Sequence, residues 1–139
     1  PPTSTTPVAL ATYEESIFAT GDNTVVFLLD TASSQHIVSN FGLISDPTPV
    51  TVDFKTVSGA ASCRCKGLVK LTLSDGDQIT LNEAHFVPTA AVNILSASKL
   101  IERGWVIDLA NNALVLPNQK TVRLTRQGPM WVATFKHSA

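Results

Sequence analysis

The sequence feature that most constrains the fold is the run from Val25 to Leu29, five apolar residues that lead directly into Asp30. Its length and its β-branched and aromatic content predict a strand that is buried on both faces. A carboxylate at the end of such a strand must be solvated, hydrogen-bonded, paired or protonated, because burying it alone is costly. The next residues, Thr31 to Ser34, are small and mostly hydroxylated, which is typical of a tight turn whose donors face the acid. On spacing alone, a structural Asp that anchors its own turn explains this pattern as well as a catalytic Asp does.

Composition restricts the class of protein. The 139 residues are 44% hydrophobic and 15% charged, which indicates one globular domain with a real core. With a net charge of −1, the chain lacks the excess of positive charge that is typical of proteins that bind nucleic acid or an anionic membrane. No apolar run approaches the length of a membrane span, and the N-terminus has no signal-peptide pattern. Two cysteines are too few for a disulfide framework, so an intracellular, reducing setting is the default expectation.

Local patterns divide the chain into a leader and a folded domain. Residues 1–12 are rich in Pro and Thr and predict a flexible leader or a piece of a longer polyprotein, which leaves 13–139 as the domain. Residues 95–103 place apolar side chains at helical spacing before Gly104, which predicts one short helix. Several alternating runs follow and end at 130–135. They predict terminal strands with one apolar face and an edge that needs a partner.

A long hairpin is predicted between the first strand and the helix. Residues 50–54 and 68–73 alternate and form its arms, 56–67 are small and predict a flexible tip, and 41–49 carry two prolines and predict a loop. Such a tip suits a mobile lid and an ordinary exposed hairpin equally well. The tip residues that we single out are Val57, Ser58, Gly59, Ala60 and Ala61.

Cys63 and Cys65 lie on the returning arm of this hairpin. Zinc ligands with this spacing need two more partners, and the histidines that could serve are distant in sequence. These histidines are His36, His85 and His137. Free thiols are therefore favoured, and we expect neither a metal nor another cofactor. If the protein dimerises, the thiols of two hairpins could approach each other.

Two motifs carry a family resemblance. The segment 28–33, Leu-Leu-Asp-Thr-Ala-Ser, resembles the active-site loop of aspartic proteases, where an apolar pair precedes Asp, Thr or Ser, Gly and a small residue. Its continuation to His36 is similar to the Asp-Ser-Gly-Ala-Ser-Ser-His pattern of the protease in copia-type LTR retrotransposon polyproteins, although Ala32 replaces the usual Gly. The segments 86–88 and 93–96 resemble a second pattern of that protease, an apolar-Pro turn followed by Asn-Leu-Leu-Ser and a helix. Two motifs in the right order are more specific than either alone.

The resemblance implies an all-β, retropepsin-like closed β-barrel with one short helix at about 95–103, functional as a homodimer. It implies that Asp30 is catalytic and that Thr31, Ala32 and Ser33 support the active-site loop. The hairpin at about 54–69 would be the flap that closes over the substrate. That substrate would be the protein's own Gag–Pol polyprotein, cleaved in the cytoplasm within virus-like particles. Neither nucleic acid nor a membrane is expected to bind this domain.

Pepsin-type hydrolysis needs two carboxylates that share a proton around one water. Only Asp30 has the matching context, because the other aspartates lie in turn sequences or within strands: Asp22, Asp46, Asp53, Asp75, Asp77 and Asp108. The second carboxylate would therefore come from a second copy at a twofold axis. Two alternatives are a retropepsin-fold interaction module without catalysis and an unrelated β-barrel that binds single-stranded nucleic acid. The near-neutral charge and scarce aromatic residues argue against the second alternative.

Overall fold

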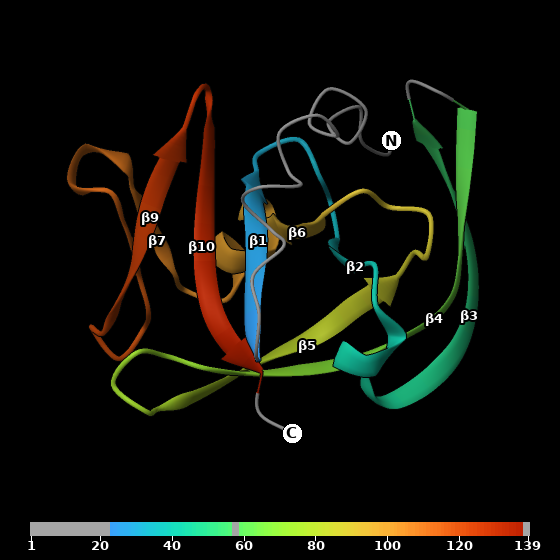
Figure 1. Cartoon of the computed structure of the whole chain (residues 1–139), viewed down its shortest axis with the longest axis horizontal. Coiled ribbons are helices and arrows are strands. Elements are labelled where there is room, and N and C mark those ends of the chain that lie inside the picture. Colours follow the sequence, from blue (N-terminus) through green and yellow to red (C-terminus); the bar gives the residue numbers. More distant parts are fainter. Residues whose placement is uncertain (1–22, 57–58, 138–139) are drawn as a thin grey trace.

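A computed structural model describes residues 23–56 and 59–137, which form a mostly β structure built around a barrel (Figure 1). The strands are β1 (Thr24–Asp30), β2 (His36–Val38), β3 (Ser45–Thr56), β4 (Gly59–Thr72), β5 (Gln78–Phe86), β6 (Asn93–Ser96), β7 (Val106–Asp108), β8 (Ala113–Val115), β9 (Thr121–Gln127) and β10 (Met130–His137). The helical elements are α3 (Ala97–Glu102) and the 3-10 turns η1 (Phe41–Leu43) and η2 (Leu109–Asn111). No helix within the described ranges has the length and hydrophobicity to cross a membrane. The predicted leader, 1–12, lies outside the described residues.

Hydrogen bonds close six of these strands into a ring. The order runs β4, β5, β2, β6, β1 and β10, and an additional pairing of β10 with β4 returns to the start. The pairs β2–β5 and β1–β6 are parallel, whereas the other pairs around the ring are antiparallel. The predicted all-β barrel with a short helix is therefore confirmed at this level. The parallel β1–β6 pair matters most for the site, because it aligns the ends of two segments that are distant in sequence.

Strand β1 runs through the middle of the core, as its apolar run predicted. Val25, Phe27 and Leu29 face one apolar cluster, and Val26 and Leu28 face a second cluster on the other side. All five side chains are buried. A strand covered on both faces reads as a continuous apolar run instead of an alternating one. The buried course of β1 fixes the position of the acid at its end.

The β3–β4 hairpin is longer than predicted. Most of 56–67 is strand instead of a flexible tip, because antiparallel pairing depends on backbone groups and tolerates small side chains. The predicted loop at 41–49 is also partly wrong, since β3 begins at Ser45 and contains Pro47 and Pro49. These prolines are tolerated because β3 ends the strand order of the described sheet, and the register shifts around them.

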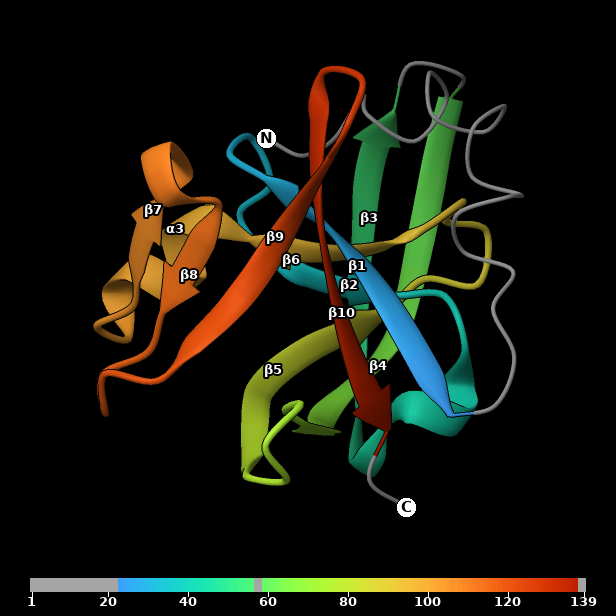
Figure 2. The same cartoon turned by 60° about the vertical axis from the view of Figure 1, so that its left-hand side comes forward.

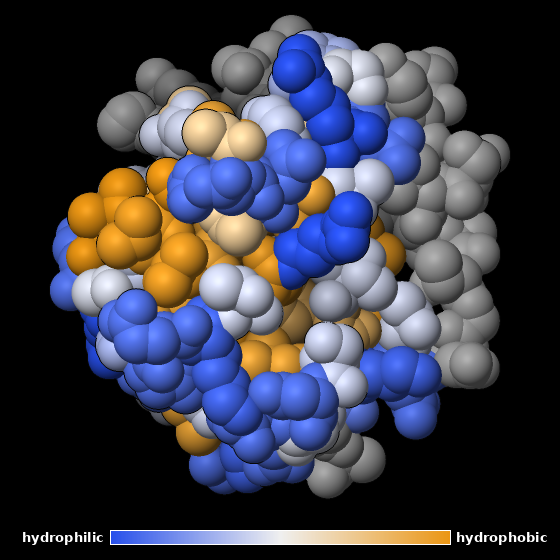
Figure 3. All heavy atoms as spheres, turned by 90° about the vertical axis from the view of Figure 1, so that its left-hand side faces the viewer, coloured by the Kyte–Doolittle hydropathy of each residue, from blue (hydrophilic) through white to orange (hydrophobic). Residues whose placement is uncertain are grey.

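The sequence predicts an edge among the terminal strands, and the strand order of the described sheet does end on one of them, although not on the last strand. Strand β10 lies between β1 and β9, and it also meets β4. The sheet order ends instead at β7, beside α3 and β8 (Figure 2). Exposed apolar side chains occur on and next to this strand, namely Ile101, Val106 and Leu109. Figure 3 shows hydrophobic residues gathered on this side of the molecule.

Candidate active site

Asp30 is the last residue of β1 and is only 7% exposed. Its Oδ1 accepts a hydrogen bond of 2.8 Å from the backbone N–H of Ala32. Thr31 and Ala32 are exposed, so the loop reaches the surface directly beside the buried acid. The predicted turn, with a donor that faces the carboxylate, is confirmed. A backbone N–H is a favourable hydrogen-bond donor to a carboxylate.

Ala32 occupies the position where the resembling proteases have Gly. Three non-glycine residues of the described ranges have left-handed φ angles, namely Asp46, Asn112 and Gln119. Ala32 is not among them, so its backbone conformation is one that any L-residue adopts. The alanine therefore does not strain this loop, and its methyl group lies at the surface.

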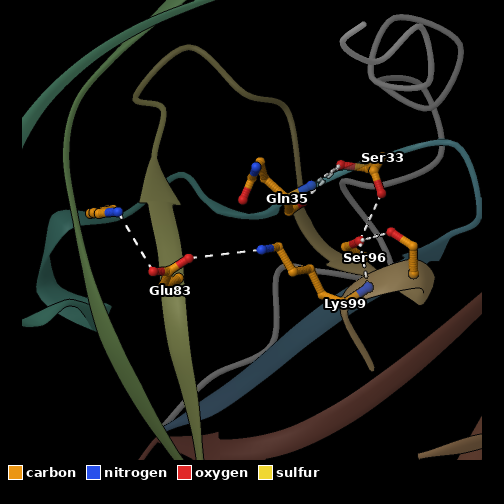
Figure 4. A network of polar contacts seen from close by, with 7 residues as sticks. Ser33, Gln35, Glu83, Ser96 and Lys99 are labelled. Carbon is orange, nitrogen blue, oxygen red and sulfur yellow. Dashed lines mark hydrogen bonds and ion pairs between the residues drawn. The ribbon is translucent and has the colours of Figure 1, made fainter. Parts of the chain in front are cut away.

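Ser96 connects the loop of Asp30 to the structure below it. Its Oγ donates to the carbonyl oxygen of Ser33 at 2.7 Å, and its backbone pairs with Asp30 in the β1–β6 register (Figure 4). The same Oγ accepts from the backbone N–H of Lys99 at 3.2 Å, which caps the N-terminus of α3. Ser33 Oγ in turn donates to the carbonyl of Gln35 at 2.7 Å. One fully buried hydroxyl thus ties the loop to both β6 and α3.

His36 holds Ser96 from the other side. The backbone N–H of Ser96 donates to Nδ1 of His36 at 3.0 Å, and the imidazole is 5% exposed. The pKa of His36 is lowered from 6.5 to about 4, mainly by burial and to a smaller extent by the positive charges of Lys99 and Arg103 and by His85. At neutral pH, His36 is therefore uncharged and can accept this bond.

Sequence reasoning missed part of this network. Asn93 Oδ1 accepts from the N–H of Ser39 at 3.0 Å, and its Nδ2 donates to the carbonyl of Val26 at 3.2 Å. The sequence identifies Ser96 only as part of a motif, and His36 only as part of a motif and as a possible metal ligand. A hydroxyl residue directly before a helical pattern is a capping signal that could have identified Ser96. No local signal reveals the contacts of His36 or Asn93, because their partners are distant in sequence.

The structure describes only some of the residues predicted to contact substrate at the tip of the β3–β4 hairpin. Val57 and Ser58 lie outside the described residues, Gly59 begins β4, and Ala60 is exposed. Ala61 packs against the cluster that contains Phe54, whose ring meets the imidazole of His85 edge-on at 6.1 Å between centroids. Phe54 is buried, so the hairpin is anchored close to its tip. A contact of the tip with substrate stays a prediction.

The two cysteines form a local structural contact. Cys63 is buried, and its Sγ donates to the carbonyl of Cys65 at 3.0 Å. Burial raises the pKa of the Cys63 thiol, which makes it a poor nucleophile and metal ligand at neutral pH. Both thiols are free. Within the described part of the chain, no three His, Cys, Asp or Glu side chains are placed to hold a metal ion together.

Residues 27–105 match the model of a family described as Pol polyprotein, beta-barrel domain, and this match spans more than half of the chain. The chain belongs to this family. The matched segment of this Pol polyprotein β-barrel domain contains the loop of Asp30, the hairpin, β6 and α3, whereas β10, which closes the barrel, lies beyond it. The chain is thus a region of a Pol polyprotein, in line with the retrotransposon origin expected from its motifs. A comparison with curated proteins gives no match.

Proposed function

We propose that this β-barrel domain is the retropepsin-like aspartic endopeptidase of a copia-type retrotransposon, and that it cleaves the Gag–Pol polyprotein of which it is part. The observation that carries the proposal is the setting of Asp30. This acid ends a strand that is buried on both faces, its Oδ1 receives the N–H of Ala32, and its loop is supported through Ser96. A buried support below a carboxylate whose loop reaches the surface is what catalysis by a positioned acid requires.

The proposed mechanism uses two copies of Asp30 at a twofold axis. The ionised carboxylate takes a proton from the attacking water, while the protonated one donates a hydrogen bond to the scissile carbonyl. Thr31 is exposed next to the acid, where it can contact the corresponding loop of the second copy. Two coupled carboxylates titrate as a pair, so activity is expected to be highest at mildly acidic pH. The β3–β4 hairpin would cover the bound peptide, with Val57 to Ala61 at its tip.

The direct test is cleavage of a Gag–Pol fragment by the chain and by its Asp30→Asn variant. This substitution keeps the size of the side chain but removes the acid, so cleavage should fall to background. Asp46→Asn is the matched control, because Asp46 is exposed and its φ of 51° suits Asn as well as Asp. Full cleavage by Asp30→Asn would refute the assignment of the catalytic residue.

A mixing experiment tests whether the site is shared between two copies. If each active centre needs two Asp30 carboxylates, an excess of the Asp30→Asn chain should inhibit the unmodified chain by forming mixed dimers. Sedimentation measures the dimer itself. Cleavage that is unaffected by the excess would show that one chain suffices. A dimer that cleaves no polyprotein junction, even at acidic pH, would favour an interaction module with this fold.

A further inference from the structure

The mechanism proposed above makes no use of His36, although this imidazole contacts the support of the catalytic loop. Its Nδ1 accepts the N–H of Ser96 at 3.0 Å, and Ser96 Oγ holds the carbonyl of Ser33 at 2.7 Å. Ser96 also lies opposite Asp30 in the β1–β6 register. Two hydrogen bonds therefore link the imidazole to the loop, and the middle residue is adjacent to the acid.

We propose that neutral His36 is a positioning residue for the loop of Asp30, and that protonation of its Nδ1 releases this loop. An unprotonated Nδ1 accepts the N–H of Ser96, whereas a protonated one turns an N–H donor toward another donor. The bond is then lost, and the buried N–H of Ser96 is left without its acceptor. For catalysis this inference rests on the proposed function, but its effect on the loop does not.

The charges around His36 oppose its protonation at neutral pH. Lys99 lies in α3 and Arg103 is the C-cap residue of this helix, and both line a cavity of about 190 Å³ together with His36. From β5, Glu83 lines the same cavity, and His85 adds a further repulsion when it is charged.

Glu83 does not cancel these positive charges. Its carboxylate lies 3.8 Å from Nζ of Lys99 and 3.6 Å from Nζ of Lys66 (Figure 4). Its charge is therefore shared between two lysines, while Arg103 lines the same cavity as the imidazole. The result is a neutral, buried His36 with a pKa of about 4.

This arrangement sets an acid limit for the proposed enzyme, that is, a lowest pH at which the loop of Asp30 keeps its support. The catalytic carboxylates favour mildly acidic pH, but below the pKa of His36 their supporting loop loses its anchor. We expect the two effects to be separable, because the first depends on Asp30 and the second on the buried imidazole of His36.

The first test is an NMR titration of the unmodified chain, which needs no substrate. We expect Nδ1 of His36 to be unprotonated at pH 7, and the amide signal of Ser96 to move with the titration of His36 near pH 4. Arg103→Gln should raise this midpoint, because it removes one of the repelling cations. A Ser96 amide that is insensitive to the titration of His36 would overturn the inference, whatever the outcome for protease activity.

The second test compares two variants of His36 in the polyprotein cleavage assay. Asn keeps an acceptor near the position of Nδ1 but cannot be protonated, so His36→Asn should keep cleavage at pH 6 and extend it to lower pH. His36→Leu removes the acceptor and should lower kcat by at least about tenfold, with little change in KM. Equal losses in both variants, with no change in the acid limit, would mean that His36 is only a packing residue. Cleavage by neither variant nor the unmodified chain would refute the proposed function but leave the NMR result intact.

Discussion

The sharpest test of the loop support is the substitution Ser96→Ala. Ser96 is completely buried, and besides a contact with the hydroxyl of Ser98 its Oγ makes two hydrogen bonds to the backbone that alanine cannot replace. One is the N-terminal cap of α3 to the N–H of Lys99, and the other is the bond to the carbonyl of Ser33. The substitution changes volume little, so its cost should come from these two bonds instead of from a cavity.

The expected cost follows from the two contacts. Loss of a serine cap lowers stability by about 1 kcal/mol. Removing the donor to the Ser33 carbonyl, which belongs to a residue that is 2% exposed, costs about 1–3 kcal/mol because the acceptor stays buried. The free energy of unfolding should therefore fall by about 2–4 kcal/mol in total. Cleavage should fall as well, since Ser33 lies in the loop of Asp30.

Urea denaturation at pH 7 measures this change, and Ser98→Ala is the matched control. Ser98 lies two residues after Ser96 in the first turn of α3, is exposed, and has its Oγ 3.1 Å from that of Ser96. Its removal should change the free energy of unfolding by less than about 0.5 kcal/mol. If both variants lose the same stability, Ser96 is an ordinary cap, and the proposed link to the loop is wrong.

Two further stability predictions use other features. His36 has a pKa of 6.5 in the unfolded chain and of about 4 in the folded one. Protonation of His36 therefore does not lower the free energy of unfolding above pH 6.5, but lowers it progressively as the pH falls from 6.5 toward 4. This loss is about 3 kcal/mol, and comparison of urea denaturation at pH 7 and pH 4 should show it in the unmodified chain but not in His36→Asn. Gly67→Ala should lower stability by about 1–3 kcal/mol in a thermal melt, because the new Cβ would lie 2.6 Å from the carbonyl of Ser45 and 2.7 Å from Cγ2 of Ile44. Gly42→Ala, whose Cβ would meet only an exposed side chain, should melt close to the unmodified chain.

Local patterns were sufficient for the elements that contain the candidate site. The apolar run before Asp30 predicted a strand buried on both faces, and two core clusters fill those faces. Helical spacing before Gly104 predicted α3, although the helix begins at Ala97 because β6 occupies the residues before it. The small residues after Asp30 predicted its turn. Each of these features depends on neighbours in the chain, so sequence periodicity and turn chemistry report them directly.

What the sequence alone determined is thus the acid, its turn and the strand that carries them. The tertiary structure decided what supports the acid, since Ser96 and His36 reach the loop only through the pairing of β6 with β1 and with β2. It also decided that β10 closes the barrel instead of offering an edge, and that β3 can include two prolines at the end of the sheet. The physical reason is the same in each case. Strand partners and buried hydrogen bonds join residues far apart in the chain, and no local pattern encodes which partner a strand will find.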